Sequence, residues 1–102
     1  MKVTVLSIFL FISAVLMTNV SARDWKVGEN GLVRWDTNCH YSNNNQIGNK
    51  PSTGEQCGGV CIANNKCTHF AYGFGTCYMF ANPGGESAAD GSWTCGFVMA
   101  RI

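Results

Sequence analysis

The distribution of apolar and polar residues divides the chain into a hydrophobic leader and a mixed remainder. Residues 3–16 form a nearly unbroken apolar run after the positive start Met1-Lys2. The small residues Val20-Ser21-Ala22 follow in the pattern of a cleavage site. The run is short for the ~20 apolar residues that a membrane-spanning helix needs. We therefore interpret residues 1–22 as an export signal, with an uncleaved membrane anchor as the alternative, and residues 23–102 as a single domain.

Alternation of large apolar and polar residues predicts strands in this domain. Residues 32–35 give a first strand, and residues 92–100 give a final one. Residues 68–72 and 76–80 predict a hairpin around Gly73-Phe74-Gly75. Strands that alternate apolar and polar residues in this way favour an antiparallel sheet.

Two polar segments are predicted to be surface loops. Residues 39–49 are rich in asparagine and leave room for a short extended piece at residues 46–48. Residues 82–91 contain proline, glycine and other small residues.

One helix is predicted, beginning after Pro51 and ending at Asn64-Asn65, because asparagine tolerates the left-handed conformation of a helix end. Gly58-Gly59 weakens it by up to ~1 kcal/mol per glycine relative to alanine. Cys57 and Cys61 share one face, so disulfides can anchor it. Its start offers two alternative capping boxes, Ser52 with Glu55 or Thr53 with Gln56.

Cysteine content adds a covalent framework to this pattern. An even number of cysteines in a small exported chain is typical of disulfides, each of which adds ~2–4 kcal/mol of stability. A domain of this size buries too little surface to offset its chain entropy comfortably without them. The six cysteines all follow the leader: Cys39, Cys57, Cys61, Cys67, Cys77 and Cys95.

The predicted helix restricts how these cysteines pair. Residues one helical turn apart are too distant and wrongly aimed for a bridge, so Cys57 and Cys61 must both bond elsewhere. The most economical geometry joins each helix cysteine to a nearby segment and the two outer cysteines to each other. It gives Cys61–Cys67, Cys57–Cys77 and Cys39–Cys95, although spacing alone leaves other pairings open.

These motifs resemble the PAN/apple domain family. That family has a C-x3-C helix, a C-x-x-F strand and a further cysteine on a hairpin, matched here by Cys57-Gly58-Gly59-Val60-Cys61, Cys67-Thr68-His69-Phe70 and Cys77-Tyr78-Met79. The resemblance covers Leu32 to Val98 and implies an α+β fold, with one short helix held by two disulfides on a small antiparallel sheet. In the apple branch an outer bridge joins the first and last cysteines, the positions of Cys39 and Cys95. The shorter segments of this chain imply a compact variant.

Alternation along the hairpin indicates where a ligand would bind. If Cys67 and Cys77 both face the helix, then the aromatic residues Phe70, Tyr72, Tyr78 and Phe80 lie on the opposite face. Such a layer is either a second core or a binding platform for sugars or an apolar partner surface. The asparagine-rich loop is a second candidate contact region, because its amides and rings suit sugar hydroxyls; it contributes His40, Tyr41 and Asn43.

Charge and site chemistry narrow the function. Outside the leader the chain carries six basic and six acidic residues, a formal net charge of zero. This balance argues against nucleic acid, and against a membrane once the signal is cleaved. His40 and His69 alone make a poor metal site, and bridged cysteines cannot attack a substrate, so we predict no metal, no cofactor and no enzymatic activity.

The resemblance implies binding of proteins or carbohydrates outside the cell. We therefore predict a secreted recognition module for an extracellular carbohydrate or protein. A small secreted defence or toxin-like peptide, acting on a membrane or receptor, is the alternative, and a structural matrix component is a third interpretation.

Overall fold

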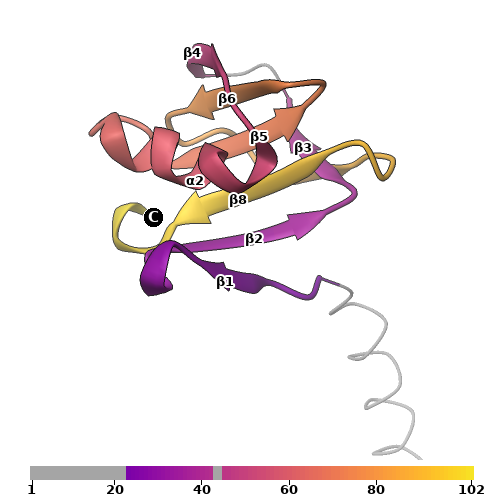
Figure 1. Cartoon of the computed structure of the whole chain (residues 1–102), viewed down its shortest axis with the longest axis horizontal. Coiled ribbons are helices and arrows are strands. Elements are labelled where there is room, and N and C mark those ends of the chain that lie inside the picture. The colour runs from indigo at the N-terminus through magenta and orange to yellow at the C-terminus, as the bar shows by residue number, and fades with distance from the viewer. Residues whose placement is uncertain (1–22, 43–44) are drawn as a thin grey trace, which may run out of the picture.

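The computed structural model describes residues 23–42 and 45–102; the predicted export signal and Asn43 lie outside this part. Within it, one α-helix packs on a six-stranded antiparallel sheet of order β1-β2-β8-β5-β6-β4, which confirms the predicted α+β class (Figure 1). Short 3-10 turns span Glu29–Gly31 and Met99–Arg101. The other elements are β1 (Lys26–Gly28), β2 (Val33–Thr37), β3 (Cys39–Tyr41), β4 (Gln46–Pro51), α2 (Gly54–Ala63), β5 (His69–Gly73), β6 (Thr76–Phe80), β7 (Glu86–Ala88) and β8 (Thr94–Val98).

The predicted hairpin forms β5 and β6, which pair from His69 with Phe80 to Gly73 with Thr76. Its two turn residues, Phe74 and Gly75, have φ of 54° and 78°. Positive φ at both central positions is the geometry that matches the twist of a two-residue hairpin. The tight turn places Phe74 in solvent, with 78% of its surface exposed.

Both predicted loops contain strands. β4 is six residues long and forms one edge of the sheet, where the prediction allowed only a short extended piece. β3 and β7 pair with each other in a separate two-stranded ribbon. β7 is exposed throughout and β4 is largely exposed, so neither shows the apolar alternation by which strands are predicted. Pairing with neighbouring strands, rather than burial, defines them.

The helix begins with the second of the two predicted capping boxes. Thr53 Oγ1 accepts a hydrogen bond from the Gln56 backbone N–H at 3.2 Å, and the Gln56 side-chain oxygen accepts from the Thr53 N–H at 3.5 Å. The helix ends at Ala63, close to the predicted stop. However, Asn64 is extended, with φ −101°, so the expected left-handed ending is wrong.

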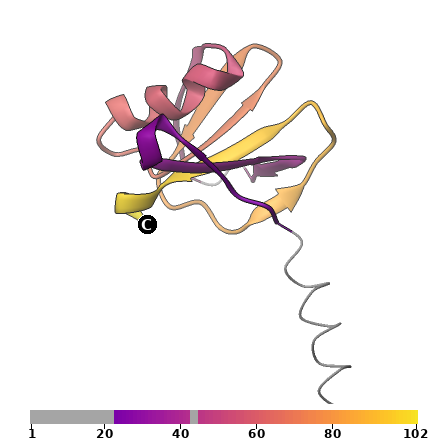
Figure 2. The same cartoon turned by 60° about the horizontal axis from the view of Figure 1, so that its bottom comes forward.

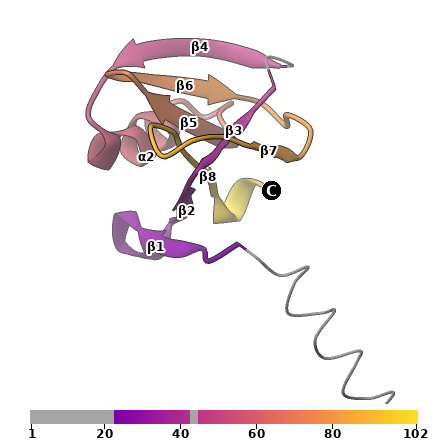
Figure 3. The ribbon, with the colours of Figure 1, turned by 90° about the vertical axis from the view of Figure 1, so that its right-hand side faces the viewer.

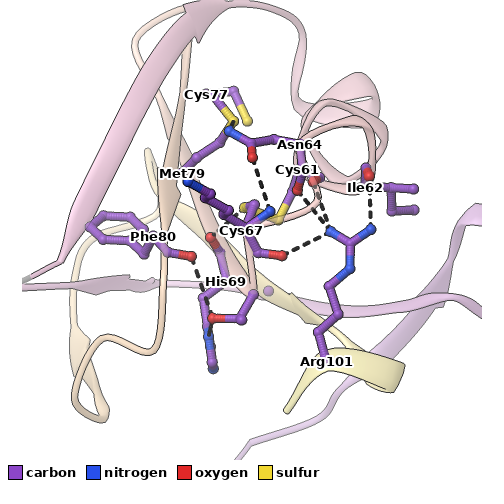
Figure 4. The surroundings of a disulfide bond; sticks show 12 residues. Cys61, Ile62, Asn64, Cys67, His69, Cys77, Met79, Phe80 and Arg101 are labelled. Atoms are coloured by element: carbon purple, nitrogen blue, oxygen red, sulfur yellow. Dashed lines mark hydrogen bonds between the residues drawn. A yellow bond between two sulfur atoms is a disulfide. The ribbon is translucent and has the colours of Figure 1, made fainter.

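Instead, the side chain of Arg101 caps the carbonyl groups at the end of the helix. Its Nη1 donates to the carbonyl oxygens of Cys61, Asn64 and Cys67 at 3.2, 2.9 and 3.0 Å. Its Nη2 donates to the carbonyl of Ile62 at 2.9 Å (Figure 4). The last carbonyls of a helix lack partners within the helix and carry partial negative charge, so a guanidinium satisfies both needs.

The three predicted disulfides are confirmed, and all six cysteines are fully buried. Two of them hold α2: Cys57–Cys77 ties it to β6, and Cys61–Cys67 closes the chain just beyond its end. The third, Cys39–Cys95, joins β3 to β8. Since β3 belongs to the separate ribbon, this bond fastens the ribbon to the main sheet.

The main sheet is therefore covered on both faces (Figure 3). On one face, the core beneath α2 contains Val33, Phe70, Met79 and Val98 with two of the disulfides. On the other, the ribbon covers a second buried cluster made by Tyr41, Ala71, Phe80 and the Cys39–Cys95 bond, with Trp25, Tyr78 and Trp93 packed at its margin.

The predicted facing of side chains is right for β6. Cys77 and Met79 belong to the core beneath α2, whereas Tyr78 and Phe80 belong to the cluster on the opposite face. The cysteine anchored to the helix fixes this register, because successive side chains of a strand point to opposite faces.

The predicted facing is wrong for β5. Phe70 and Tyr72 pack in the core beneath α2, and Ala71 lies on the opposite face. The prediction counted alternation from Cys67, but the strand begins at His69, so the count does not carry across the intervening backbone. Antiparallel pairing with β6 sets the facing instead, since Phe70 lies opposite Met79.

An acidic side chain holds the start of the described chain against the sheet. Asp36 is 7% exposed and accepts hydrogen bonds from the backbone N–H of Thr37 and Asp24, at 2.8 and 3.1 Å. Lys26 Nζ and Arg23 Nη1 donate to it at 3.0 and 3.3 Å. Burial alone would raise the pKa of Asp36, but these donors outweigh it and lower the pKa to about 2.

The Asp36 carboxylate makes the free energy of unfolding depend on pH in the acidic range. Because its folded pKa lies below the unfolded value, its contribution is present above about pH 4 and is lost as the pH falls toward about 2. We expect that loss to be about 2 kcal/mol in the free energy of unfolding, measured by urea denaturation at a series of pH values. Asp36→Asn should remove this acid dependence, and the matched variant Asp24→Asn should keep it. An unchanged pH profile in Asp36→Asn would contradict the assignment.

Candidate functional site

A hollow of about 480 Å³ opens on the sheet face opposite α2, beside the ribbon strand β3. Its volume falls in the range of small-ligand sites. Residues from β3, β4, β5, β6 and the segment before β8 meet there, and we call the site the aromatic hollow. Its lining consists of His40, Tyr41, Ser42, Gln46, Ala71, Tyr78, Phe80 and Trp93.

The floor of the aromatic hollow is buried. Tyr41 and Phe80 are 5% and 3% exposed, and their rings pack edge-on at 5.5 Å. The Tyr41 hydroxyl donates to the carbonyl of Gly96 at 3.1 Å. Burial, with the nearby Glu86 charge, raises the pKa of Tyr41, so the phenol stays neutral. These groups support the site because their polar atoms are already satisfied.

Three half-buried rings form the walls. Trp93 lies between Tyr78 and His40, with centroid distances of 5.9 and 5.6 Å. The indole rests on the backbone of Gly73, where an added Cβ would lie 2.6 Å from Trp93 Cε3. Only glycine therefore allows Trp93 this position. Phe74 packs edge-on against the same indole at 5.8 Å and continues the aromatic surface beyond the hollow.

Polar groups surround these rings. His40 Nδ1 lies 3.1 Å from the carbonyl of Tyr41. A carbonyl oxygen only accepts, so Nδ1 carries a hydrogen, and Nε2 is the ring nitrogen that remains for a ligand. Ser42 and Gln46 add an exposed hydroxyl and an exposed amide from the two chain segments at the rim. The site thus combines apolar ring faces with groups that can donate hydrogen bonds and groups that can accept them.

The structure brings together four of the seven predicted contact residues: His40, Tyr41, Tyr78 and Phe80. It places Phe70 and Tyr72 on the other face, beneath α2. Phe70 is 2% exposed and packs so closely on Gly96 that an added Cβ there would lie 2.4 Å from the ring. The seventh, Asn43, lies outside the described residues.

Sequence reasoning did not single out Trp93, Ser42 or Gln46 as contact residues, although Ser42 and Gln46 belong to the predicted contact loop. The prediction placed Trp93 within the final strand, but that strand begins at Thr94, so Trp93 lies in the segment before it. Gln46 reaches the hollow because β4 pairs with β6, a long-range contact without a local sequence signal. The one available signal was Gly73, since a glycine within a strand often marks close approach by another group.

The described residues hold neither a candidate metal cluster nor a free thiol. No group of three or more His, Cys, Asp or Glu residues in ranges 23–42 and 45–102 lies close enough to hold a metal ion. Every cysteine is in a disulfide. In the same ranges no helix is long and apolar enough to cross a membrane.

The fold and site define a disulfide-stabilised α+β domain with an aromatic concavity. No family model, curated protein or solved structure matches the chain. The resemblance to PAN/apple domains therefore stays a prediction from cysteine spacing and element order.

Proposed function

We propose that this protein is a secreted, non-enzymatic recognition module that binds an extracellular carbohydrate in the aromatic hollow. The observation that carries the proposal is the wall of Tyr78, Trp93 and His40 rings beside exposed polar groups. The implied kinship with PAN/apple domains, which bind carbohydrates or proteins, supports the same conclusion.

A sugar ring is complementary to such a wall. One face of a pyranose presents C–H groups that pack on an aromatic ring, while its edge presents hydroxyls that both donate and accept hydrogen bonds. Trp93 and Tyr78 supply ring faces, and His40 Nε2 with the rim residues Ser42 and Gln46 supplies polar partners. A concavity of this volume suits a terminal sugar or a short saccharide.

A protein partner is the second candidate, favoured by one observation. Phe74 is 78% exposed at the β5–β6 turn and touches Trp93, so an apolar surface continues outside the hollow. Large exposed aromatic residues next to a concavity are typical anchors of protein interfaces. A saccharide held inside the hollow would not need Phe74, which separates the two candidates.

The expected result on a glycan array is a set of related saccharides bound by the full chain secreted from an expression host. Trp93→Ala should weaken binding to a hit by about 30-fold or more, the effect of removing a central aromatic anchor. Gly73→Ala should also weaken it, because the added methyl displaces the indole without removing it. The matched control Phe74→Ala should leave saccharide affinity unchanged.

Saccharide binding that survives Trp93→Ala undiminished in a folded variant would contradict the proposed site. An array without hits, combined with a protein partner lost on Phe74→Ala, would select the second candidate. Strong leakage of liposomes at low protein concentration would instead support the defence-peptide alternative.

A further inference from the structure

A second concavity lies on the opposite face of the sheet from the aromatic hollow. It is a groove of about 440 Å³ formed by α2, β2, the end of β1 and the 3-10 turn Glu29–Gly31, which lies beside the helix (Figure 2). Three glycines, Gly28, Gly54 and Gly58, form part of its lining, and we call it the glycine-lined groove. It contains no residue of the aromatic hollow.

The glycines keep this groove open. A Cβ at Gly28 would lie 3.0 Å from Val33 Cγ2 and 3.2 Å from Trp35 Cδ1, and one at Gly58 would lie 3.3 Å from Val33 Cγ2. Glycine within a helix is about 1 kcal/mol less favourable than alanine. Gly58 therefore makes the helix less stable than alanine would, but it allows close packing against Val33 and leaves the groove open.

Two carboxylates lie at the groove, those of Glu29 and Glu55. Glu29 lies along the helix, with Oε1 3.4 Å from the position a Cβ would take at Gly59. In residues 23–42 and 45–102, every ion pair uses Asp36 or Glu86, so neither groove carboxylate has a cation within 4.0 Å. The local charge left for a ligand is negative.

Apolar groups complete the groove. Val33 and Phe70, each 2% exposed, line it, and Trp35 is half-buried beside them. The Trp35 ring already attracts one cation, since Lys26 Nζ lies 5.3 Å from its centroid. That ammonium also donates to Asp36 at 3.0 Å, which compensates its charge. The groove thus offers an apolar bed next to two carboxylates that make no ion pair.

We propose that the glycine-lined groove binds a lysine or arginine side chain presented by a protein partner. The aliphatic stem of such a side chain packs on Val33, Phe70 and Trp35, and its charged end reaches Glu29 and Glu55. Charge complementarity excludes an acidic occupant. The proposal goes beyond saccharide binding and does not depend on it, because the two sites share no residue.

Indole N–H signals in the nuclear magnetic resonance spectrum test this directly, since the chain has three tryptophans and Trp35 and Trp93 lie in different sites. N-acetyl-lysine methylamide should shift the Trp35 signal saturably and leave Trp93 in place. N-acetyl-norleucine methylamide, with the same stem and no charge, should shift neither. A peptide with a central lysine should bind more tightly than the free amide if a partner protein is the natural source.

Substitution of the carboxylates gives the quantitative part of the test. Glu29→Gln or Glu55→Gln should each weaken binding of the lysine probe about three- to fivefold, the effect of one exposed ion pair. Glu86→Gln, remote from the groove, should leave it unchanged. Because Glu29 has φ 50°, Glu55→Gln is the decisive variant if Glu29→Gln does not fold.

The proposal would be overturned by equal shifts with the norleucine probe, by a shift at Trp93 instead of Trp35, or by unchanged affinity in both carboxylate variants. The absence of any shift up to saturating probe would overturn it as well. Each of these outcomes leaves the saccharide experiment unaffected, because that experiment reads the Trp93 side of the molecule.

Discussion

Replacing Cys39 and Cys95 together with alanine is expected to lower the free energy of unfolding by about 4 kcal/mol. The two cysteines are 56 residues apart in sequence, so their bond removes much conformational freedom from the unfolded chain. It is also the covalent link between the β3–β7 ribbon and the main sheet. Urea denaturation under non-reducing conditions measures the loss.

The Cys61–Cys67 pair supplies the matched control. Its cysteines are only 6 residues apart, and the same entropic argument gives about 2 kcal/mol for the double alanine variant. The Cys39/Cys95 variant should also lose saccharide binding, since β3 carries His40 and Tyr41 into the aromatic hollow. Equal destabilisation by the two double variants would contradict the account of the long-range bond.

Arg101→Ala is expected to cost about 2–3 kcal/mol of unfolding free energy, because it removes a charged donor from the half-buried carbonyls at the end of α2. Arg101→Lys should recover only part of this loss, since an ammonium cannot match the planar fork that reaches both Asn64 and Ile62. Thermal unfolding followed by circular dichroism measures both variants.

Arg34→Ala is the control for Arg101. The Arg34 guanidinium also donates to backbone carbonyls, those of Gly31 and Val33, but these lie in a turn and at the start of a strand rather than at a helix end. We expect it to change stability by less than about 1 kcal/mol. A loss in Arg101→Ala no larger than in Arg34→Ala would show that the helix end does not need its cap.

Local signals in the sequence predicted the elements that local chemistry defines. The helix follows from the capping pattern at Thr53 and Gln56, and the hairpin follows from the turn at Gly73-Phe74-Gly75. The exclusion of a Cys57–Cys61 bond follows because both cysteines share a helix face and must bond outward. Each of these inferences starts from residues that are near one another in sequence.

What escaped prediction depends on contacts between distant residues. Arg101 caps a helix that ends almost 40 positions earlier, at Ala63. β3 and β7 are strands of only three residues that pair across 45 or more positions, from Tyr41 to Glu86 and from Cys39 to Ala88. Trp93 lies over Gly73 because β8 pairs with β5, with Thr94 opposite Tyr72. None of these arrangements leaves a periodic pattern in the sequence.

The wrong facing of β5 shows how an error in one strand boundary changes which residues are predicted to form a site. Alternation counted from Cys67 placed Phe70 and Tyr72 on the face away from the helix. The strand begins only at His69, after irregular backbone that breaks the count, and both rings lie on the helix side. β5 therefore contributes only Ala71 to the aromatic hollow. The other side of the hollow is formed by His40 from the ribbon, Gln46 from the edge strand and Trp93 from the segment before the last strand.

The most direct measurement is a titration of the isotopically labelled full chain with a saccharide selected on the array, monitored at the indole N–H signals. We predict that the Trp93 signal moves to a saturated position while the Trp35 signal stays still. Bound saccharide with an unmoved Trp93 signal would mean that recognition takes place elsewhere on the molecule, and the aromatic hollow would be no more than the margin of a core.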